Sequence, residues 1–176
     1  FLTIVPMFHC NGWCYPWTVP MLHGRTICLR NIDIKKIFEL IDKYEVTHFG
    51  GAPIVLNMIT GAAESDRKKL KRKVYVLTAG APPPSVIFKK MKNLGFEVMH
   101  VYGLTETYGH VTQCAWNDEW DGLEEEKQNE IKARQGVRYP NTEGVTIMDP
   151  ETMKEVPRDG KTIGEIMIRG NVVMKG

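Results

Sequence analysis

The chain has 176 residues and a formal net charge of +2; 43% of its residues are hydrophobic and 25% are charged. This length predicts one hydrophobic core, the composition is typical of a globular protein, and the near-neutral charge argues against a nucleic-acid partner. The apolar stretches are short and interrupted by polar residues, so no membrane span is expected. Four cysteines are too few for a disulfide scaffold.

The first part of the chain alternates predicted strands and helices. Short apolar runs predict strands at residues 1–5, 25–29 and 46–49. Asp33 is placed as the N-cap of an amphipathic helix, since its carboxylate can accept a hydrogen bond from a free backbone N–H. Pro53 is placed at the first position of the next helix, where a missing N–H does no harm.

The same alternation continues through residue 101. Apolar runs predict strands at residues 74–78 and 97–101, and the helix between them is predicted to have Ser85 as its N-cap and to be closed by Gly95. Strands that alternate with helices are typical of an α/β fold. The predicted architecture is therefore a mostly parallel sheet flanked by helices.

The sequence changes character after about residue 112. A highly charged helix is predicted at residues 123–134, and short apolar segments with a turn at Asp159-Gly160 predict β-hairpins in residues 143–168. We therefore expect residues 1–115 to form an α/β part. Residues 116–176 are expected to form the charged helix and a small β-rich subdomain.

The segment from Tyr102 to Thr107 directly follows a predicted buried strand, where ligands of open α/β sheets bind. Tyr102 offers an aromatic face to a base, and Gly103 allows close approach to the backbone. Thr105 offers a hydroxyl to a phosphate oxygen, and Glu106 is a carboxylate of the kind that Mg²⁺ prefers. The residues alone fit a magnesium-nucleotide site and a solvated polar loop equally well.

Two further segments follow predicted strand ends. The small residues from Ala79 to Pro82 would let a flat ring lie against the backbone, although they also suit a tight turn, and both interpretations can hold. His9 lies after the first predicted strand. A single histidine beside an apolar run is usually a packing residue, so its spacing does not indicate catalysis.

Five segments in this order resemble the adenylate-forming superfamily of AMP-dependent synthetases and ligases: PMFHCNGW, GGAP, LTAGAPPP, HVYGLTETYG and GEIMIRGNVVMKG. Within it, the chain is most similar to plant acyl-activating enzymes for short-chain, medium-chain or aromatic acids. The resemblance covers essentially the whole chain, and five ordered segments are far more specific than one. It implies that the chain is a central part of the large adenylate-forming domain.

The resemblance implies a nucleotide site. Tyr102 would stack on adenine, Thr105 would bind the α-phosphate, and Glu106 would hold Mg²⁺. Thr105 and Glu106 would be catalytic residues. The implied nucleotide-binding residues are Gly80, Ala81, Pro82, Tyr102, Gly103, Leu104 and Thr105.

The resemblance also implies an acyl site. His9 would be a catalytic gate residue near the carboxylate of the acid. The residues expected to line or approach the acyl pocket are His9, Cys10, Asn11, Gly109 and His110. The size of the side chain that follows Gly109 would reshape this pocket.

The implied activity is that of an acid–coenzyme A ligase of fatty acid metabolism, peroxisomal or cytosolic. Such an enzyme activates a carboxylic acid with ATP and Mg²⁺ to an acyl-adenylate, and coenzyme A then takes the acyl group. The phosphate loop, the ribose-binding Asp and the lid domain with its Lys are not in this sequence. We therefore expect a fragment that is nearly inactive alone, with no obligate protein partner.

Two alternatives remain open at this point. The first is another adenylating enzyme, such as a luciferase-like oxidase or an amino-acid adenylation domain. Cys10 stands where an amino-acid-activating domain typically has an Asp, which argues for an acid without an amine. The second is a truncated, non-catalytic nucleotide-binding or interaction module.

Overall fold

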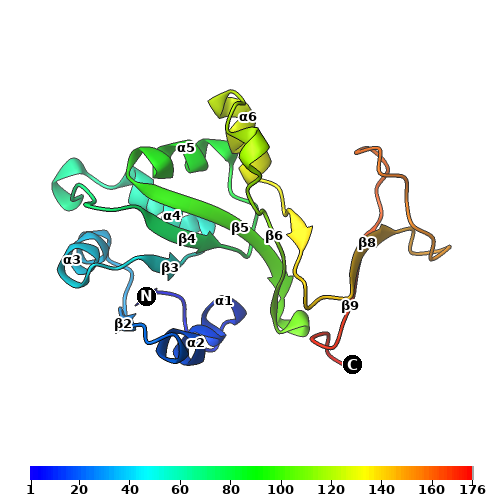
Figure 1. The fold of residues 1–176 in the computed structure, drawn as a ribbon, viewed down its shortest axis with the longest axis horizontal. Coiled ribbons are helices and arrows are strands. Elements are labelled where there is room, and N and C mark those ends of the chain that lie inside the picture. Colours follow the sequence, from blue (N-terminus) through cyan, green and yellow to red (C-terminus); the bar gives the residue numbers. More distant parts are fainter. Residues whose placement is uncertain (176) are drawn as a thin grey trace.

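The computed structural model describes residues 1–175, which form a seven-stranded sheet and a separate two-stranded sheet (Figure 1). The first five strands of the large sheet run parallel, and the last two are antiparallel. In spatial order the strands are β2 (Ile27–Cys28), β1 (Leu2–Thr3), β3 (His48–Gly50), β4 (Val74–Thr78), β5 (Phe96–Leu104), β6 (Gly109–Gln113) and β7 (Val137–Arg138). The predicted α/β class with a mostly parallel sheet is confirmed.

Within residues 1–175, the chain also forms six α-helices and three 3₁₀ turns. The α-helices are α1 (Cys10–Trp13), α2 (Tyr15–Met21), α3 (Ile34–Tyr44), α4 (Pro53–Gly61), α5 (Ser85–Asn93) and α6 (Glu125–Lys132). The 3₁₀ turns are η1 (Glu64–Asp66), η2 (Thr105–Thr107) and η3 (Asp118–Trp120). No helix within residues 1–175 is long and apolar enough to cross a membrane.

Two predicted helix starts are confirmed and one is wrong. The Asp33 carboxylate accepts a hydrogen bond from the Lys36 N–H at 3.1 Å, and Pro53 is the first residue of α4. Ser85 is not the N-cap of α5, because Pro84 takes that position with an extended backbone and Ser85 becomes the first helical residue. The ψ of 141° at Pro84 is outside the helical range, so Pro84 is the last non-helical residue before the helix.

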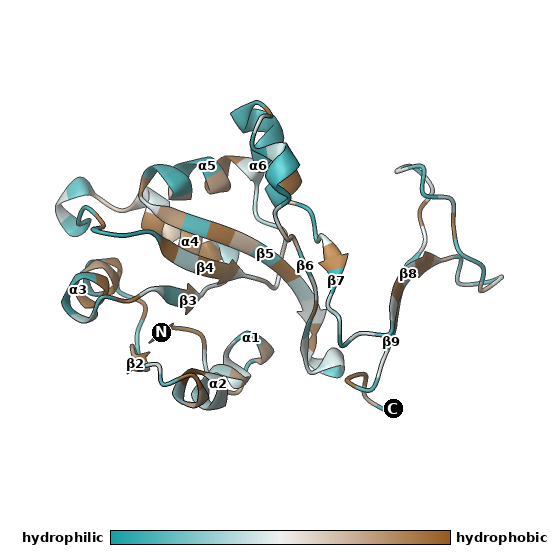
Figure 2. Cartoon of the chain, in the orientation of Figure 1, coloured by the Kyte–Doolittle hydropathy of each residue, from teal (hydrophilic) through white to brown (hydrophobic). Residues whose placement is uncertain are grey.

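The hydrophobic core lies on one face of the large sheet, where α3, α4 and α5 pack against β4 and β5. Phe38 of α3 meets Phe96 of β5 edge to face, with ring centroids 5.9 Å apart. The buried core residues of the three helices are Ile37, Phe38, Ile41, Val55, Leu56, Ile59, Ile87, Phe88 and Met91. In Figure 2, hydrophobic residues recur along β4 and β5, whereas α6 is largely hydrophilic.

The opposite face of the large sheet is less covered. Tyr75 of β4 is 45% exposed, Met99 of β5 is 38% exposed, and the exposed His48 ring stacks on Tyr75 with centroids 5.1 Å apart. Parallel sheets are usually buried on both faces. Within residues 1–175, this face therefore lacks the cover that such sheets normally have.

Strand β5 is longer than predicted. The predicted strand ends at Val101, but the structure continues it to Leu104. Tyr102 pairs with β6 before a register shift between Tyr102 and Gly103, and Gly103 and Leu104 pair with β6 after it. The first three residues of the segment from Tyr102 to Thr107 are thus sheet residues. Only η2 lies beyond the strand.

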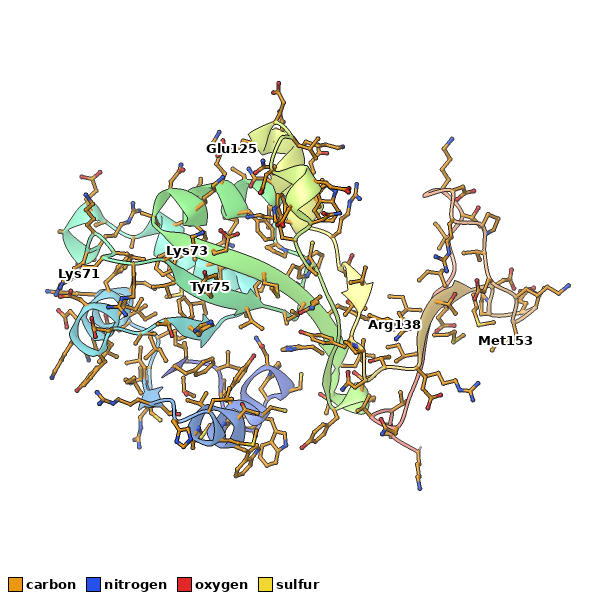
Figure 3. The ribbon with its side chains drawn as sticks, viewed as in Figure 1. Lys71, Lys73, Tyr75, Glu125, Arg138 and Met153 are labelled. Atoms are coloured by element: carbon orange, nitrogen blue, oxygen red, sulfur yellow. The ribbon has the colours of Figure 1, made fainter. Side chains whose placement is uncertain are left out.

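The last part of the chain is divided between the two sheets. Helix α6 contacts α5, and β7 pairs with β6 in the large sheet. Strands β8 (Gly144–Met148) and β9 (Glu165–Arg169) form the predicted antiparallel sheet. Met153, in the segment between them, lies well away from Tyr75 on the large sheet (Figure 3). The division into parts at residue 115 stays a prediction.

Candidate functional site

Four parallel strands bring their carboxyl ends to one edge of the large sheet, because β1 pairs with β3, β3 with β4 and β4 with β5. The segments leaving these ends carry His9, Gly51, Gly80 and Thr105. The Gly51 N–H donates to the Leu77 carbonyl at 2.9 Å, which ties the ends of β3 and β4 together. Ligands of open α/β sheets bind at such an edge.

The segment after β4 forms a turn with an open outer surface. Gly80 has φ +94°, a conformation that favours glycine, and a β-carbon there would meet nothing within 4 Å. Ala81 and Pro82 are exposed. The turn interpretation is therefore right, and the open backbone leaves room for the predicted flat ring beside it.

A buried hydroxyl precedes this turn. Thr78 is fully buried at the end of β4, and its Oγ1 has no hydrogen-bond partner within the described residues. Leaving a buried hydroxyl unpaired is unfavourable by about 1–3 kcal/mol. Thr78 was not a predicted site residue, because only the packed structure shows that its hydroxyl lacks a partner.

Gly103 is required by the chain itself. A β-carbon at Gly103 would overlap the Gly109 carbonyl oxygen, since β5 and β6 approach closely there. Its neighbours Tyr102 and Leu104 lie in the same strand. Tyr102 is half-buried, and Leu104 is 42% exposed. The predicted roles of the three residues toward a nucleotide stay predictions, as does stacking of adenine between Tyr102 and the Gly80 turn.

Turn η2 presents Thr105 and Glu106 to solvent and buries Thr107. The Thr107 hydroxyl accepts a hydrogen bond from the Leu104 N–H at 2.9 Å and lies 2.9 Å from the Gly109 carbonyl oxygen, to which it can donate. These bonds fix the shape of the turn. Thr107 was missed as a positioning residue, although a threonine three residues after a strand end is a usable turn signal.

The segment that follows β9 reaches η2. The Met174 N–H donates to the Glu106 carbonyl at 2.8 Å. The Glu106 carboxylate itself forms no ion pair within residues 1–175. No group of three or more His, Cys, Asp or Glu side chains in that range could hold a metal ion alone. Any metal at Glu106 would therefore need ligands from a bound molecule or water.

His9 is the N-cap of α1. Its Nδ1 accepts a hydrogen bond from the Asn11 N–H at 3.2 Å, and the Cys10 Sγ lies 3.9 Å from the same nitrogen. With Nδ1 acting as an acceptor, a neutral ring carries its proton on Nε2. Because His9 is exposed, it can present this N–H to a ligand.

The predicted acyl residues on β6 lie against those on α1. Asn11 is buried, and its Oδ1 lies 3.0 Å from His110 Nε2, which donates to it. A β-carbon at Gly109 would lie 3.8 Å from the Cys10 carbonyl oxygen. Burial, and secondarily the charge of His9, lowers the pKa of His110. The structure thus brings together all five residues predicted for the acyl site.

A second side-chain contact joins the same elements. The Trp13 Nε1 donates to the Tyr108 hydroxyl at 2.9 Å. Tyr108 has φ +56° and is followed by Gly109 at φ +119°, so two left-handed residues reverse the chain into β6. Trp13 and Tyr108 were not predicted site residues, since no local sequence pattern shows that two residues 95 positions apart are in contact.

Comparisons with known proteins find similar chains. The chain is 54% identical to "Acetate/butyrate--CoA ligase AAE7, peroxisomal" of Arabidopsis thaliana, over all of this chain and 31% of that protein. It is 53% identical to "Acetate--CoA ligase CCL3" of Humulus lupulus, with the same two coverages. The chain thus spans about a third of the length of these relatives.

The fold is also found among solved structures. O-succinylbenzoate coenzyme A synthetase of Bacillus subtilis, in complex with ATP and magnesium ion, matches 99% of this chain with 34% of its own, at 18% identity and a TM-score of 0.73. The model of the family described as "AMP-binding enzyme" matches residues 1–176. The chain therefore belongs to the AMP-binding enzyme family.

Proposed function

We propose that this chain is the central part of an AMP-forming acid–coenzyme A ligase. The parent enzyme would convert a carboxylic acid and ATP into an acyl-adenylate and pyrophosphate, and then transfer the acyl group to coenzyme A with release of AMP. The observation that carries the proposal is the pair of exposed side chains on η2, Thr105 and Glu106, at the carboxyl edge of the sheet in an AMP-binding family member.

The residues at this edge fit a magnesium nucleotide. Glu106 offers a carboxylate without an ion-pair partner within residues 1–175, and Mg²⁺ in nucleotide sites takes one or two carboxylates plus phosphate oxygens and water. The Thr105 hydroxyl can donate to a phosphate oxygen. The open backbone of the Gly80 turn leaves space for the adenine ring beside it.

Each side chain has a distinct task in this proposal. Mg²⁺, when bound, would offset the charge of the phosphates. Thr105 would donate to an α-phosphate oxygen, and Tyr102 with the Gly80 turn would flank the adenine ring. His9 would orient the acid, because its exposed Nε2–H can donate to a carboxylate. The chain's contribution is thus mainly positioning and electrostatic stabilisation.

The proposed substrate is a short carboxylic acid. Two relatives are named for acetate or acetate and butyrate. A peroxisomal site of action is proposed by likeness to the relative named peroxisomal.

Glu106→Gln in the full-length parent tests the proposal. The loss of a metal-binding carboxylate should lower acid-dependent pyrophosphate exchange by about tenfold or more and raise the Mg²⁺ concentration needed for half-maximal rate. Glu126→Gln, an exposed glutamate on α6, is the matched control and should change neither quantity. An unchanged exchange rate in Glu106→Gln would remove η2 from the active site.

A further inference from the structure

Two side-chain hydrogen bonds join α1 to the start of β6. Trp13 Nε1 donates to the Tyr108 hydroxyl at 2.9 Å, and His110 Nε2 donates to Asn11 Oδ1 at 3.0 Å. We call these four residues the α1–β6 contact. The partners are 95 and 99 positions apart in the chain. In Figure 1, α1 lies beside the end of β5 and β6 where η2 turns back.

Tyr108 is an unusual residue for its backbone position. Its φ of +56° lies in the left-handed region, which glycine adopts readily and a bulky side chain does not. Burial of the side chain does not explain the tyrosine, because Tyr108 is 60% exposed. Its hydroxyl accepts the hydrogen bond from Trp13. Strained residues that persist in this way mark functional positions.

Helix α1 depends on its neighbours for its position. It has four residues, too few to be stable as an isolated helix. Gly12 packs so closely on the backbone of Pro6 that a β-carbon would overlap the Pro6 carbonyl oxygen. The α1–β6 contact supplies the other anchor. It links the helix that begins after His9 to the turn that carries Glu106.

We propose that Tyr108 is a positioning residue for the carboxylic acid. By accepting the Trp13 hydrogen bond, Tyr108 holds α1 against β6, so that His9 is fixed relative to η2 and the acid meets the nucleotide in the orientation required for reaction. Tyr108 does not touch the nucleotide in this proposal. The inference rests on the proposed ligase function.

Tyr108→Phe in the full-length parent tests the role. The variant keeps the ring and the left-handed backbone and removes only the acceptor, so the KM for the acid should rise about two- to tenfold, while the KM for ATP stays unchanged. Trp116→Phe is the matched control, since it removes an indole hydrogen bond of 2.8 Å, to Asp121, in the segment between β6 and α6. It should change neither KM.

A double-mutant cycle with Trp13→Phe gives the second readout. Removing either partner breaks the same hydrogen bond, so the effects of Trp13→Phe and Tyr108→Phe on the KM for the acid should be strongly non-additive. Additive effects, an unchanged KM for the acid in Tyr108→Phe, or an equal rise in both KM values would overturn the positioning role. None of these outcomes would contradict the proposed function, because that function is tested separately by Glu106→Gln.

Discussion

The imidazole of His110 lies against α1, where burial and the nearby His9 lower its pKa below the ordinary value of 6.5. A histidine whose pKa is lowered on folding binds fewer protons in the folded than in the unfolded state. Its contribution to stability is therefore fully present above 6.5 and is lost as the pH falls below that value. We predict that the urea midpoint of unfolding decreases between about pH 7 and about pH 5.

Two histidine variants check this prediction. His110→Gln should flatten the pH dependence, because glutamine does not titrate. His23→Gln, at an exposed position, should leave it unchanged. Burial also lowers the pKa of His48, so His48 adds a contribution of the same sign. If the urea midpoint of His110→Gln depends on pH as strongly as that of the unchanged chain, protonation of His110 does not destabilise the fold.

At the residue scale, the sequence predicted those site residues whose side-chain type is typical of a particular binding or catalytic role. The predicted acyl residues His9 and Asn11 do meet Gly109 and His110 at one place, although their roles there stay predictions. Thr107 was not found, because its hydroxyl matters through bonds to Leu104 and Gly109 that exist only in the folded turn.

At the scale of elements, the β5–β6 hairpin depends on one close approach. A β-carbon at Gly103 would overlap backbone atoms of Gly109 and His110, which cannot move away as a flexible side chain would. We predict that Gly103→Ala lowers the free energy of unfolding by about 3 kcal/mol or more. Chemical unfolding followed by circular dichroism measures this value.

Gly122→Ala is the control for that experiment. A β-carbon at Gly122 would meet nothing within 4 Å, and its φ is not in the left-handed region. The free energy of unfolding of Gly122→Ala should therefore stay within about 0.5 kcal/mol of the unchanged chain. Equal effects of the two substitutions would mean that the close approach of β5 and β6 is not what requires Gly103.

The elements that were predicted well are those with local signals. Helix α3 combines a capping Asp33 with an apolar face, and both appear as expected. The end of β5 was placed at Val101, three residues before its end in the structure. The pairing of Tyr102, Gly103 and Leu104 with β6 depends on a chain reversal at Tyr108. Tyr108 has a left-handed backbone, and a tyrosine does not predict this conformation.

At the scale of the whole molecule, one face of the large sheet carries exposed apolar side chains. Tyr75 and Met99 are 45% and 38% exposed on neighbouring strands. We predict that the isolated chain binds an environment-sensitive hydrophobic dye, and that the double variant Tyr75→Thr, Met99→Thr clearly lowers its fluorescence. Threonine keeps the preference for strand structure while removing most apolar surface.

Met153→Thr provides the comparison, since Met153 is 55% exposed in the segment between β8 and β9, away from this face (Figure 3). Its loss should change dye fluorescence little. If Met153→Thr lowers the fluorescence as much as the double variant, the dye does not report on the uncovered face of the sheet.

The hydrogen bond from Met174 to the Glu106 carbonyl has a practical consequence for protein engineering. Strands β8 and β9 form a sheet separate from the large one, so one would expect their removal to leave the site unchanged. The segment after Arg169, however, restrains the turn that bears the proposed metal-binding carboxylate. Deletions or tags introduced there would loosen η2 from a distance. Activity lost on shortening this region should accordingly be traced to a displaced carboxylate before it is attributed to unfolding.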